Sequence, residues 1–331
     1  MNEKQPAQYA GNKIWIGVDI GGTKTAIVLC SQPPGVLARV EFPTIPEQGP
    51  DRAVDLMLKT IHQLIREYGI GPGELQAIGV SCGGPLDRVT GVIQTPPNLP
   101  TWVDVPIRSI LEGEFDVPCR PENDANAGAV AEHRFGAGQG SRHMIFLTMG
   151  TGLGGGIIVD GRLYHGASDM AGEIGHVRLT SSGPVGYNKE GSVEGWASGG
   201  GMAQAAYQEV TAAIEKGEAT TLAAHFATTR TLTAKDVASA ARQGDEVAKR
   251  IVHSTGARLG EVLAILVDLL NPEVIVIGGL AMRFGDSLLE PARIAMQREA
   301  LPPAATACRI VPAALGEEIG DIAAICVAMG F

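Results

Sequence analysis

Two glycine-rich turns are the first features of this sequence whose residue types suit phosphate binding. The first turn lies between the strand-length runs 14–19 and 26–29 and contains two adjacent glycines, a threonine and a lysine. Adjacent glycines leave backbone N–H groups free to face an anion, and an aspartate beside them could hold Mg²⁺ through water. Its candidate ligands are Asp19, Gly21, Gly22, Thr23 and Lys24. The alternative is a plain β-hairpin with a surface lysine.

The second turn follows the apolar run 144–148 and offers hydroxyl groups but no charge, so it suits a second phosphate. Its candidate ligands are Thr148, Gly150, Thr151, Gly152, Gly154 and Gly155. A further pair, Gly278 and Gly279, follows the buried strand predicted at 273–277 and precedes a predicted helix. Glycines there let a flat ring approach the backbone closely. Close packing between the strand and the helix would use the same glycines.

A polar segment, Glu122-Asn-Asp-Ala-Asn126, stands where a strand is expected to end and a helix to begin. Asp124 or Asn123 could simply cap the helix. The functional alternative is that Asp124 is a general base. Phosphoryl transfer to an alcohol needs one carboxylate that orients the hydroxyl group and takes its proton, while positioning supplies most of the rest.

Two glutamates and a histidine form a third polar group. Glu173 and His176 are flanked by Gly172 and Gly175, which favour a loop over a helix, and Glu194 follows later. Carboxylates and an imidazole with little charge nearby suit hydrogen bonding to several sugar hydroxyls, and a surface ion pair is the alternative. The residue order and the glycines exclude the zinc-protease motif H-E-x-x-H.

The elements that must position these residues alternate between strands and helices, which predicts an α/β protein with mixed sheets. A strand, a glycine turn and a returning strand head each half of the chain, at 14–29 and at 144–160, with the second turn spanning 149–156. This recurrence indicates a duplicated fold, although glycine-rich hairpins are common. Residues 161–201 are expected to be irregular, 202–270 largely helical, and Asn271-Pro272 to end the last of those helices.

Composition excludes several classes of protein. The chain has 331 residues, of which 45% are hydrophobic, and a net charge of −10, which is unlike a nucleic-acid binder. The longest apolar stretch is too short to span a bilayer, and residues 1–13 carry no apolar secretory segment. The five cysteines are odd in number and scattered, which predicts reduced thiols in the cytoplasm.

Taken together, these segments resemble the ROK family of sugar kinases and sugar-responsive repressors, within the actin/hexokinase-like ATPase fold. The motifs that carry the resemblance are Asp19–Lys24, Glu122–Asn126, Thr148–Gly156, Gly172–His176 and Val276–Gly279. The resemblance implies an α/β, ribonuclease H-like fold of two lobes, each a mixed sheet flanked by helices. The small lobe would comprise 1–123 with 313–331 and the large lobe 124–312, with ATP and a sugar in the cleft between them.

The resemblance also implies a role for each candidate residue. Both glycine turns would hold the phosphates of ATP, Gly278 and Gly279 would lie near adenosine, and Asp124 would be the catalytic base. The residues implied in sugar binding are Asn123, Glu173, His176 and Glu194, with Gly84 and Asn98 where the small lobe closes over the sugar. The implied reaction is transfer of a phosphoryl group from Mg·ATP to a hexose hydroxyl, most often the 6-hydroxyl of glucose, in a homodimer.

One segment departs from the family pattern. Relatives carry three cysteines after the glycine–histidine pair that bind structural zinc together with this histidine, whereas this sequence has Val185, Tyr187 and Ser192 there. One imidazole cannot complete a four-ligand zinc site, so we expect no zinc. Packing of Tyr187 and local hydrogen bonds are expected to hold the segment 180–193 and His176 instead.

Three alternatives stay open at this point. A catalytically idle sugar sensor could use the same fold, although the intact turns and Asp124 favour an enzyme. An ATPase with a protein partner is less consistent with the hydroxyl-binding set. The substrate could be fructose, mannose, allose or an N-acetylhexosamine, and the donor could be polyphosphate. A DNA-binding repressor is disfavoured, since residues 1–13 are too few for a helix-turn-helix.

Overall fold

The computed structural model describes residues 13–331, which divide into two compact units. Unit 1 contains the residues up to 131 together with 317–331, and unit 2 contains residues 132–316. The lobe boundaries expected from the sequence, after residues 123 and 312, stay a prediction. Residues 1–12, for which we expect neither a secretory segment nor a DNA-binding module, lie outside the described residues.

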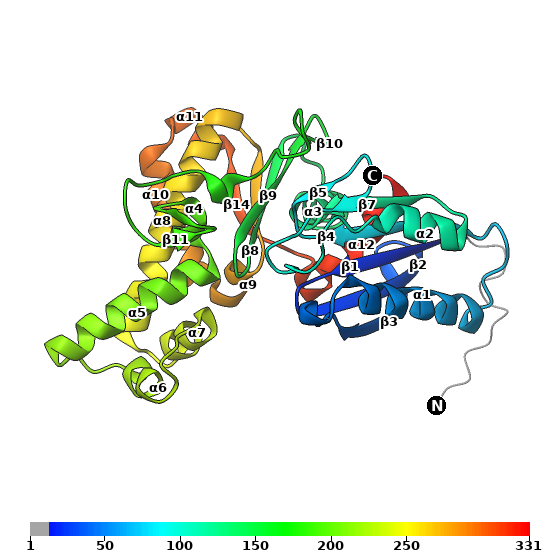
Figure 1. Ribbon diagram of the computed structural model, residues 1–331. Coiled ribbons are helices and arrows are strands. Elements are labelled where there is room, and N and C mark those ends of the chain that lie inside the picture. Colours follow the sequence, from blue (N-terminus) through cyan, green and yellow to red (C-terminus); the bar gives the residue numbers. More distant parts are fainter. Residues whose placement is uncertain (1–12) are drawn as a thin grey trace. The chain divides into compact units, whose positions relative to one another are not determined.

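The sheet of unit 1 has five strands in the order β3-β2-β1-β4-β7 (Figure 1). β2 pairs antiparallel with both β1 and β3, whereas β1–β4 and β4–β7 are parallel pairs. The strands span Ile14–Ile20 (β1), Lys24–Gln32 (β2), Gly35–Pro43 (β3), Leu75–Cys82 (β4) and Cys119–Asn123 (β7). A small hairpin, Leu86–Asp87 (β5) with Val92–Ile93 (β6), stands apart from this sheet.

Two helices cover opposite faces of this sheet. Ile16 of β1 lies in the hydrophobic cluster that includes the buried face of α1, whereas the next residue, Gly17, lies against Ala324 of α12. Successive strand residues point to opposite faces, so Asp19 faces α12, and a Cβ built on Gly320 would meet its carboxylate. The helices of unit 1 are Pro50–Glu67 (α1), Ile107–Phe115 (α2), Asp124–Phe135 (α3, whose last turn belongs to unit 2) and Ile319–Met329 (α12).

Unit 2 repeats the topology of unit 1. Its sheet has the order β10-β9-β8-β13-β14, with β9 antiparallel to β8 and β10, and with parallel pairs β8–β13 and β13–β14. The strands span Met144–Met149 (β8), Leu153–Val159 (β9), Arg162–Leu163 (β10), Val274–Ile277 (β13) and Arg309–Pro312 (β14). The internal duplication predicted from the two strand–turn–strand units is confirmed by this shared strand order.

The helices of unit 2 pack around a long central helix, α8. Close packing of α8 against α10 requires small residues, because a Cβ on Gly256 or Gly260 of α8 would meet backbone oxygens of α10. The elements are Ile174–His176 (η3), Val185–Gly186 (β11), Lys189–Glu190 (β12), Val193–Ala197 (α4), Gly199–Lys216 (α5), Thr221–Thr229 (α6), Ala234–Arg242 (α7), Glu246–Leu270 (α8), Leu280–Phe284 (α9), Asp286–Glu299 (α10) and Pro302–Ala307 (α11).

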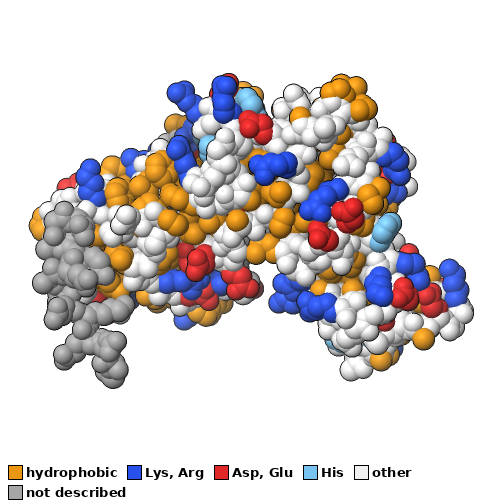
Figure 2. All heavy atoms as spheres, turned by 180° about the vertical axis from the view of Figure 1, so that it is seen from behind, with side chains coloured by type: hydrophobic (Ala, Val, Ile, Leu, Met, Phe, Trp, Pro, Cys, Tyr) orange, Lys and Arg blue, Asp and Glu red, His pale blue; other side chains and the backbone are white. Residues whose placement is uncertain are grey.

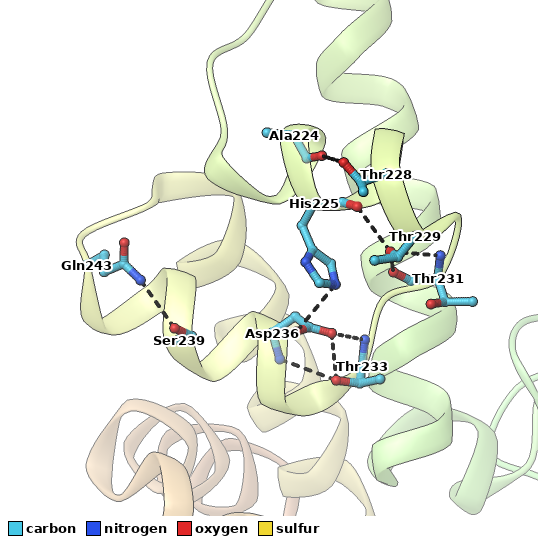
Figure 3. A network of polar contacts seen from close by, with 9 residues as sticks. All are labelled: Ala224, His225, Thr228, Thr229, Thr231, Thr233, Asp236, Ser239 and Gln243. Atoms are coloured by element: carbon cyan, nitrogen blue, oxygen red, sulfur yellow. Dashed lines mark hydrogen bonds and ion pairs between the residues drawn. The ribbon is translucent and has the colours of Figure 1, made fainter.

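The junction of α6 and α7 is fixed by side-chain hydrogen bonds (Figure 3). Thr233 caps α7 in a reciprocal capping box with Asp236, and the His225 ring of α6 lies 3.5 Å from the same aspartate. Polar contacts therefore order this corner.

The structure corrects two expectations. The second glycine turn is shorter than the predicted span 149–156, because β9 already begins at Leu153 and pairs Gly154 with Thr148 and Gly155 with Leu147. Glycines fit in this strand since Gly155 lies directly against Gly172. The stretch 161–201 is less irregular than expected, because α4 lies within it and α5 begins at Gly199.

Within residues 13–331, every helix is too short or too polar to span a lipid bilayer. The five cysteines, Cys30, Cys82, Cys119, Cys308 and Cys326, are all buried free thiols. On the face shown in Figure 2, basic and acidic side chains are interspersed.

Candidate active site

In unit 1 the first glycine turn meets the other predicted substrate residues of that unit. A Cβ built on Gly22 would lie 2.7 Å from the carbonyl oxygen of Asn98, and one on Gly84 would lie 3.2 Å from the Nδ2 of Asn123. A Cβ on Gly83 would lie 3.3 Å from the Oδ1 of Asn98. The absence of side chains lets these backbones approach, so the structure brings together residues far apart in the sequence.

At the start of α3, the residue that caps the helix is not the candidate base. The Oδ1 of Asn123 accepts hydrogen bonds from the backbone N–H groups of Ala125 and Asn126, at 2.9 and 3.3 Å, so Asn123 is the N-cap. Glu122 braces the same turn, since its Oε1 accepts from the N–H of Asn123 and from the Nδ2 of Asn126, both at 3.0 Å. Of the two capping alternatives, Asn123 is therefore the one observed.

The Oδ1 of Asp124 accepts a hydrogen bond from the N–H of Ala125 at 2.8 Å. Its side chain is exposed, yet desolvation by the surrounding protein raises its pKa, against the lowering effect of that N–H. For Asp19, desolvation above all, then the charge of Asp124, raises the pKa to about 6, while a hydrogen bond with Ser81 opposes the shift. A raised pKa is the property that a carboxylate needs to take up a proton near neutral pH.

Lys24 of the first turn does not stand alone. Its Nζ pairs with Glu41 at 2.9 Å, and Arg39 contacts both Glu41 and Asp321 of α12 at 2.7 Å. These ion pairs could not be predicted from local sequence patterns, because Arg39 and Asp321 lie 282 positions apart. The ion pairs of Glu41, Arg39 and Asp321 therefore hold Lys24 next to the carboxylate of Glu41.

In unit 2 the two glycine motifs predicted to bind nucleotide lie against each other. Gly279 has a left-handed backbone (φ 63°), and a Cβ there would overlap the carbonyl group of Met149. The N–H of Gly278 donates to the carbonyl oxygen of Leu147 at 2.9 Å. The N–H of Gly199, at the start of α5, donates to the carbonyl oxygen of Gly150 at 2.8 Å. The second turn therefore contacts both the β13–α9 turn and α5.

The polar residues of unit 2 lie beside the same turn. Glu194 of α4 accepts from the N–H of Leu153 at 3.0 Å through Oε2, so one oxygen of this predicted sugar ligand already ties α4 to the turn. A Cβ on Gly175 would lie 3.5 Å from the Cβ of Glu194, which brings η3, with Glu173 before it and His176 in it, next to α4. Unit 2 thus gathers its three predicted sugar ligands around the second turn.

Comparison with known proteins identifies the family, because the ROK family model matches residues 15–329. The chain belongs to the ROK family. The glucokinase of Halalkalibacterium halodurans is 35% identical over 93% of this chain and 92% of its own length. The glucokinase of Thermotoga maritima is 31% identical over 93% and 95%. A solved ROK family glucokinase from Streptomyces griseus, in complex with glucose and AMPPNP, is 32% identical, has a TM-score of 0.78, and is matched over 96% of this chain and 100% of its own.

These findings confirm the resemblance predicted from the sequence and the actin-like ATPase fold of this ROK protein. A second solved structure, the ROK hexokinase from Thermus thermophilus, is 32% identical with a TM-score of 0.76 over 96% of this chain. The roles of the individual site residues stay predictions.

The residues after His176 do not fit the zinc site that the family implies. The positions expected for cysteine hold Val185, Tyr187 and Ser192, and no group of three or more metal-ligating side chains occurs within residues 13–331. The Oγ of Ser192 instead accepts from the N–H of Gly195 at 3.1 Å and caps α4. By contrast, Asp19 fits Mg²⁺, which keeps most of its waters and needs only one or two carboxylates.

Replacing Asp19 by asparagine is expected to stabilise this ROK protein at alkaline pH. A folded-state pKa of about 6, above the ordinary 3.8, contributes stability that is fully present below pH 3.8 and lost as the pH rises through 6. The uncharged variant avoids that loss, so its free energy of unfolding should exceed that of the wild type by up to about 3 kcal/mol at pH 8. The difference should vanish near pH 4.

Denaturant unfolding of both proteins between pH 4 and pH 8 measures this difference. The same substitution at exposed Asp104 is the control and should give no such trend. A stability difference for Asp19→Asn that does not change with pH would contradict the prediction.

Proposed function

We propose that this ROK-family sugar kinase transfers the γ-phosphoryl group of ATP to the 6-hydroxyl of glucose, with Asp124 as the general base. The observation that carries the proposal is that two neighbouring residues at the start of α3 have different roles. Asn123 caps the helix, while Asp124, next to it in the chain, keeps an exposed carboxylate with a raised pKa. The glucokinase relatives, at 31–35% identity, support glucose as the acceptor.

In the proposed reaction Asp124 orients the sugar hydroxyl and takes its proton. The hydroxyl oxygen forms a bond to the γ-phosphorus of ATP, and the bond from that phosphorus to the bridging oxygen breaks, with its electron pair leaving on ADP. Mg²⁺, held through water by Asp19, would neutralise the phosphate charge. The proposed phosphate ligands are the glycine, threonine and lysine residues of the two turns, with Gly278 and Gly279 near adenosine.

The proposed sugar ligands divide between the two units. Unit 1 would supply Asn123, Gly84 and Asn98, which approach one another and the first turn. Unit 2 would supply Glu173, His176 and the remaining oxygen of Glu194. Two amides and an imidazole can donate to and accept from sugar hydroxyls, and two carboxylates can accept from them.

Coupled measurement of ADP release with Mg·ATP tests the proposal across glucose, fructose, mannose, allose and N-acetylhexosamines. The panel must include N-acetylmannosamine, since an N-acetylmannosamine kinase of Escherichia coli is 30% identical over 80% of this chain. A strong response to glucose supports the proposal. A response to a different sugar replaces the proposed substrate, and polyphosphate in place of ATP tests the donor.

No response to any sugar, with sugar binding still visible as a thermal shift, would overturn the proposal in favour of a sugar sensor. The homodimer and the cytoplasmic location expected from the sequence stay predictions. Sedimentation of the purified protein would test the first of these.

A further inference from the structure

The hairpin of β11 and β12 carries an aromatic residue in a costly backbone conformation. Its two-residue turn consists of Tyr187 and Asn188, with φ angles of 42° and 61°. Two-residue hairpins with both central residues at positive φ favour Asn-Gly, Asp-Gly or Gly-Gly. A bulky aromatic residue at positive φ is an outlier, and such outliers cluster at functional sites. We therefore expect the Tyr187 side chain to make a contact that offsets the cost of this backbone conformation.

That contact is with His176. The two rings lie 4.7 Å apart between centroids and almost perpendicular, at 88°. Lys189, on the other side of Asn188, donates from Nζ to the carbonyl oxygen of His176 at 2.7 Å. Among residues 13–331, no protein group hydrogen-bonds to either ring nitrogen of His176. The hairpin thus contacts the His176 ring through the ring of Tyr187, and it holds the His176 backbone through the hydrogen bond from Lys189.

The hairpin is itself anchored at sites away from His176. The Oε1 of Gln204 in α5 accepts from the N–H of Val185 at 2.9 Å, and its Nε2 donates to the Val185 carbonyl oxygen at 2.8 Å. Arg178 donates to the carbonyl oxygen of Glu190 at 2.6 Å. The hairpin is therefore secured at both strands and presents Tyr187 from a fixed base.

We propose that Tyr187 and Lys189 are positioning residues of the sugar site, and that they orient His176 in place of the metal ion for which this chain lacks ligands. The inference rests on the proposed function only in that His176 binds the sugar. A ring held by a perpendicular aromatic neighbour keeps both nitrogens available for sugar hydroxyls. Loss of the neighbour leaves the ring free to rotate and weakens sugar binding.

Tyr187→Gly separates this positioning role from a merely structural one. Glycine removes the ring but suits the left-handed turn, so the variant should unfold at the same temperature as the wild type or at a higher one. The KM for glucose should nevertheless rise about three- to tenfold, the range expected for loss of a perpendicular aromatic pair. The kcat should change less than the KM.

Two matched variants complete the kinetic test. Asn188→Gly relieves the same turn without touching His176 and should leave the KM unchanged. Tyr187→Phe keeps the ring and should restore a KM close to that of the wild type. If the KM of Tyr187→Gly equals that of Asn188→Gly, the proposal is overturned.

NMR of the histidine rings tests the inference even if the protein phosphorylates no sugar. The ring signals of His176, assigned by their loss in His176→Gln, should shift in Tyr187→Gly and stay in place in Asn188→Gly. Lys189→Met should also shift these ring signals, because it removes the hydrogen bond from Nζ to the carbonyl oxygen of His176. Unchanged ring signals in Tyr187→Gly, or stoichiometric zinc whose chelation moves these signals, would overturn the inference.

Discussion

Replacing Asp124 by asparagine is expected to lower the kcat for sugar phosphorylation by about 10²- to 10⁴-fold while the protein stays folded. This is the range that a positioned general base contributes to a reaction. Asparagine keeps an oxygen that can accept the hydrogen bond of Ala125, and Asn123 remains as the helix cap. The substitution therefore removes basicity and little else. Steady-state kinetics, with the thermal unfolding temperature measured alongside, provides the test.

The pH profile gives this prediction a second readout. Desolvation by the surrounding protein raises the pKa of Asp124, so the acidic limb of kcat/KM in the wild type should lie above the range of an ordinary aspartate. Activity should rise with pH through that limb as the carboxylate loses its proton, and Asp124→Asn should lack the limb. A variant that retains more than about a third of the wild-type kcat would show that Asp124 is not the base.

The sequence predicted the strand–turn–strand units because their information is local. An apolar run followed by glycines specifies a strand and a tight turn over few residues, and the same pattern at 144–160 correctly indicated the duplicated topology. The capping alternatives at Asn123 and Asp124 were also visible, since a cap needs only its own helix. Which of the two caps the helix required the side-chain geometry.

Other parts of the site depend on contacts between residues distant in the sequence. Gly155 of β9 lies against Gly172, and the hydrogen bond from Leu153 to Glu194 spans 41 positions. No local pattern distinguishes Glu194 as a tether from Glu194 as a free ligand. In the sequence, Tyr187 stands out only because relatives have cysteine at this position. Its positive φ angle could not be predicted, because it depends on the hairpin register that Gln204 helps to fix.

Glu132 is a structurally important residue that no sequence motif predicts. It lies in α3, within the stretch expected only to be helical, and its side chain is fully buried. Its carboxylate accepts from the N–H groups of Ala137 at 2.7 Å, Ala314 at 3.0 Å and Leu315 at 2.9 Å. Two of these donors lie more than 180 positions further along the chain. All three partners are donors, so only a carboxylate satisfies them fully.

Replacing Glu132 by alanine is expected to lower the free energy of unfolding of unit 2 by about 2–4 kcal/mol. Each lost hydrogen bond to a charged group costs about 1.5–3 kcal/mol, and relief of the buried charge offsets part of the sum. Glutamine should cost less, since it keeps one acceptor oxygen. Denaturant unfolding measures the loss, and amide hydrogen exchange should locate it at Ala314 and Leu315. The matched control is Glu299→Ala, which removes an exposed glutamate paired with its neighbour Arg298 and should stay within about 0.5 kcal/mol of the wild type. Equal stability of the Glu132→Ala and Glu299→Ala variants would show that the 314–315 segment is held by other contacts.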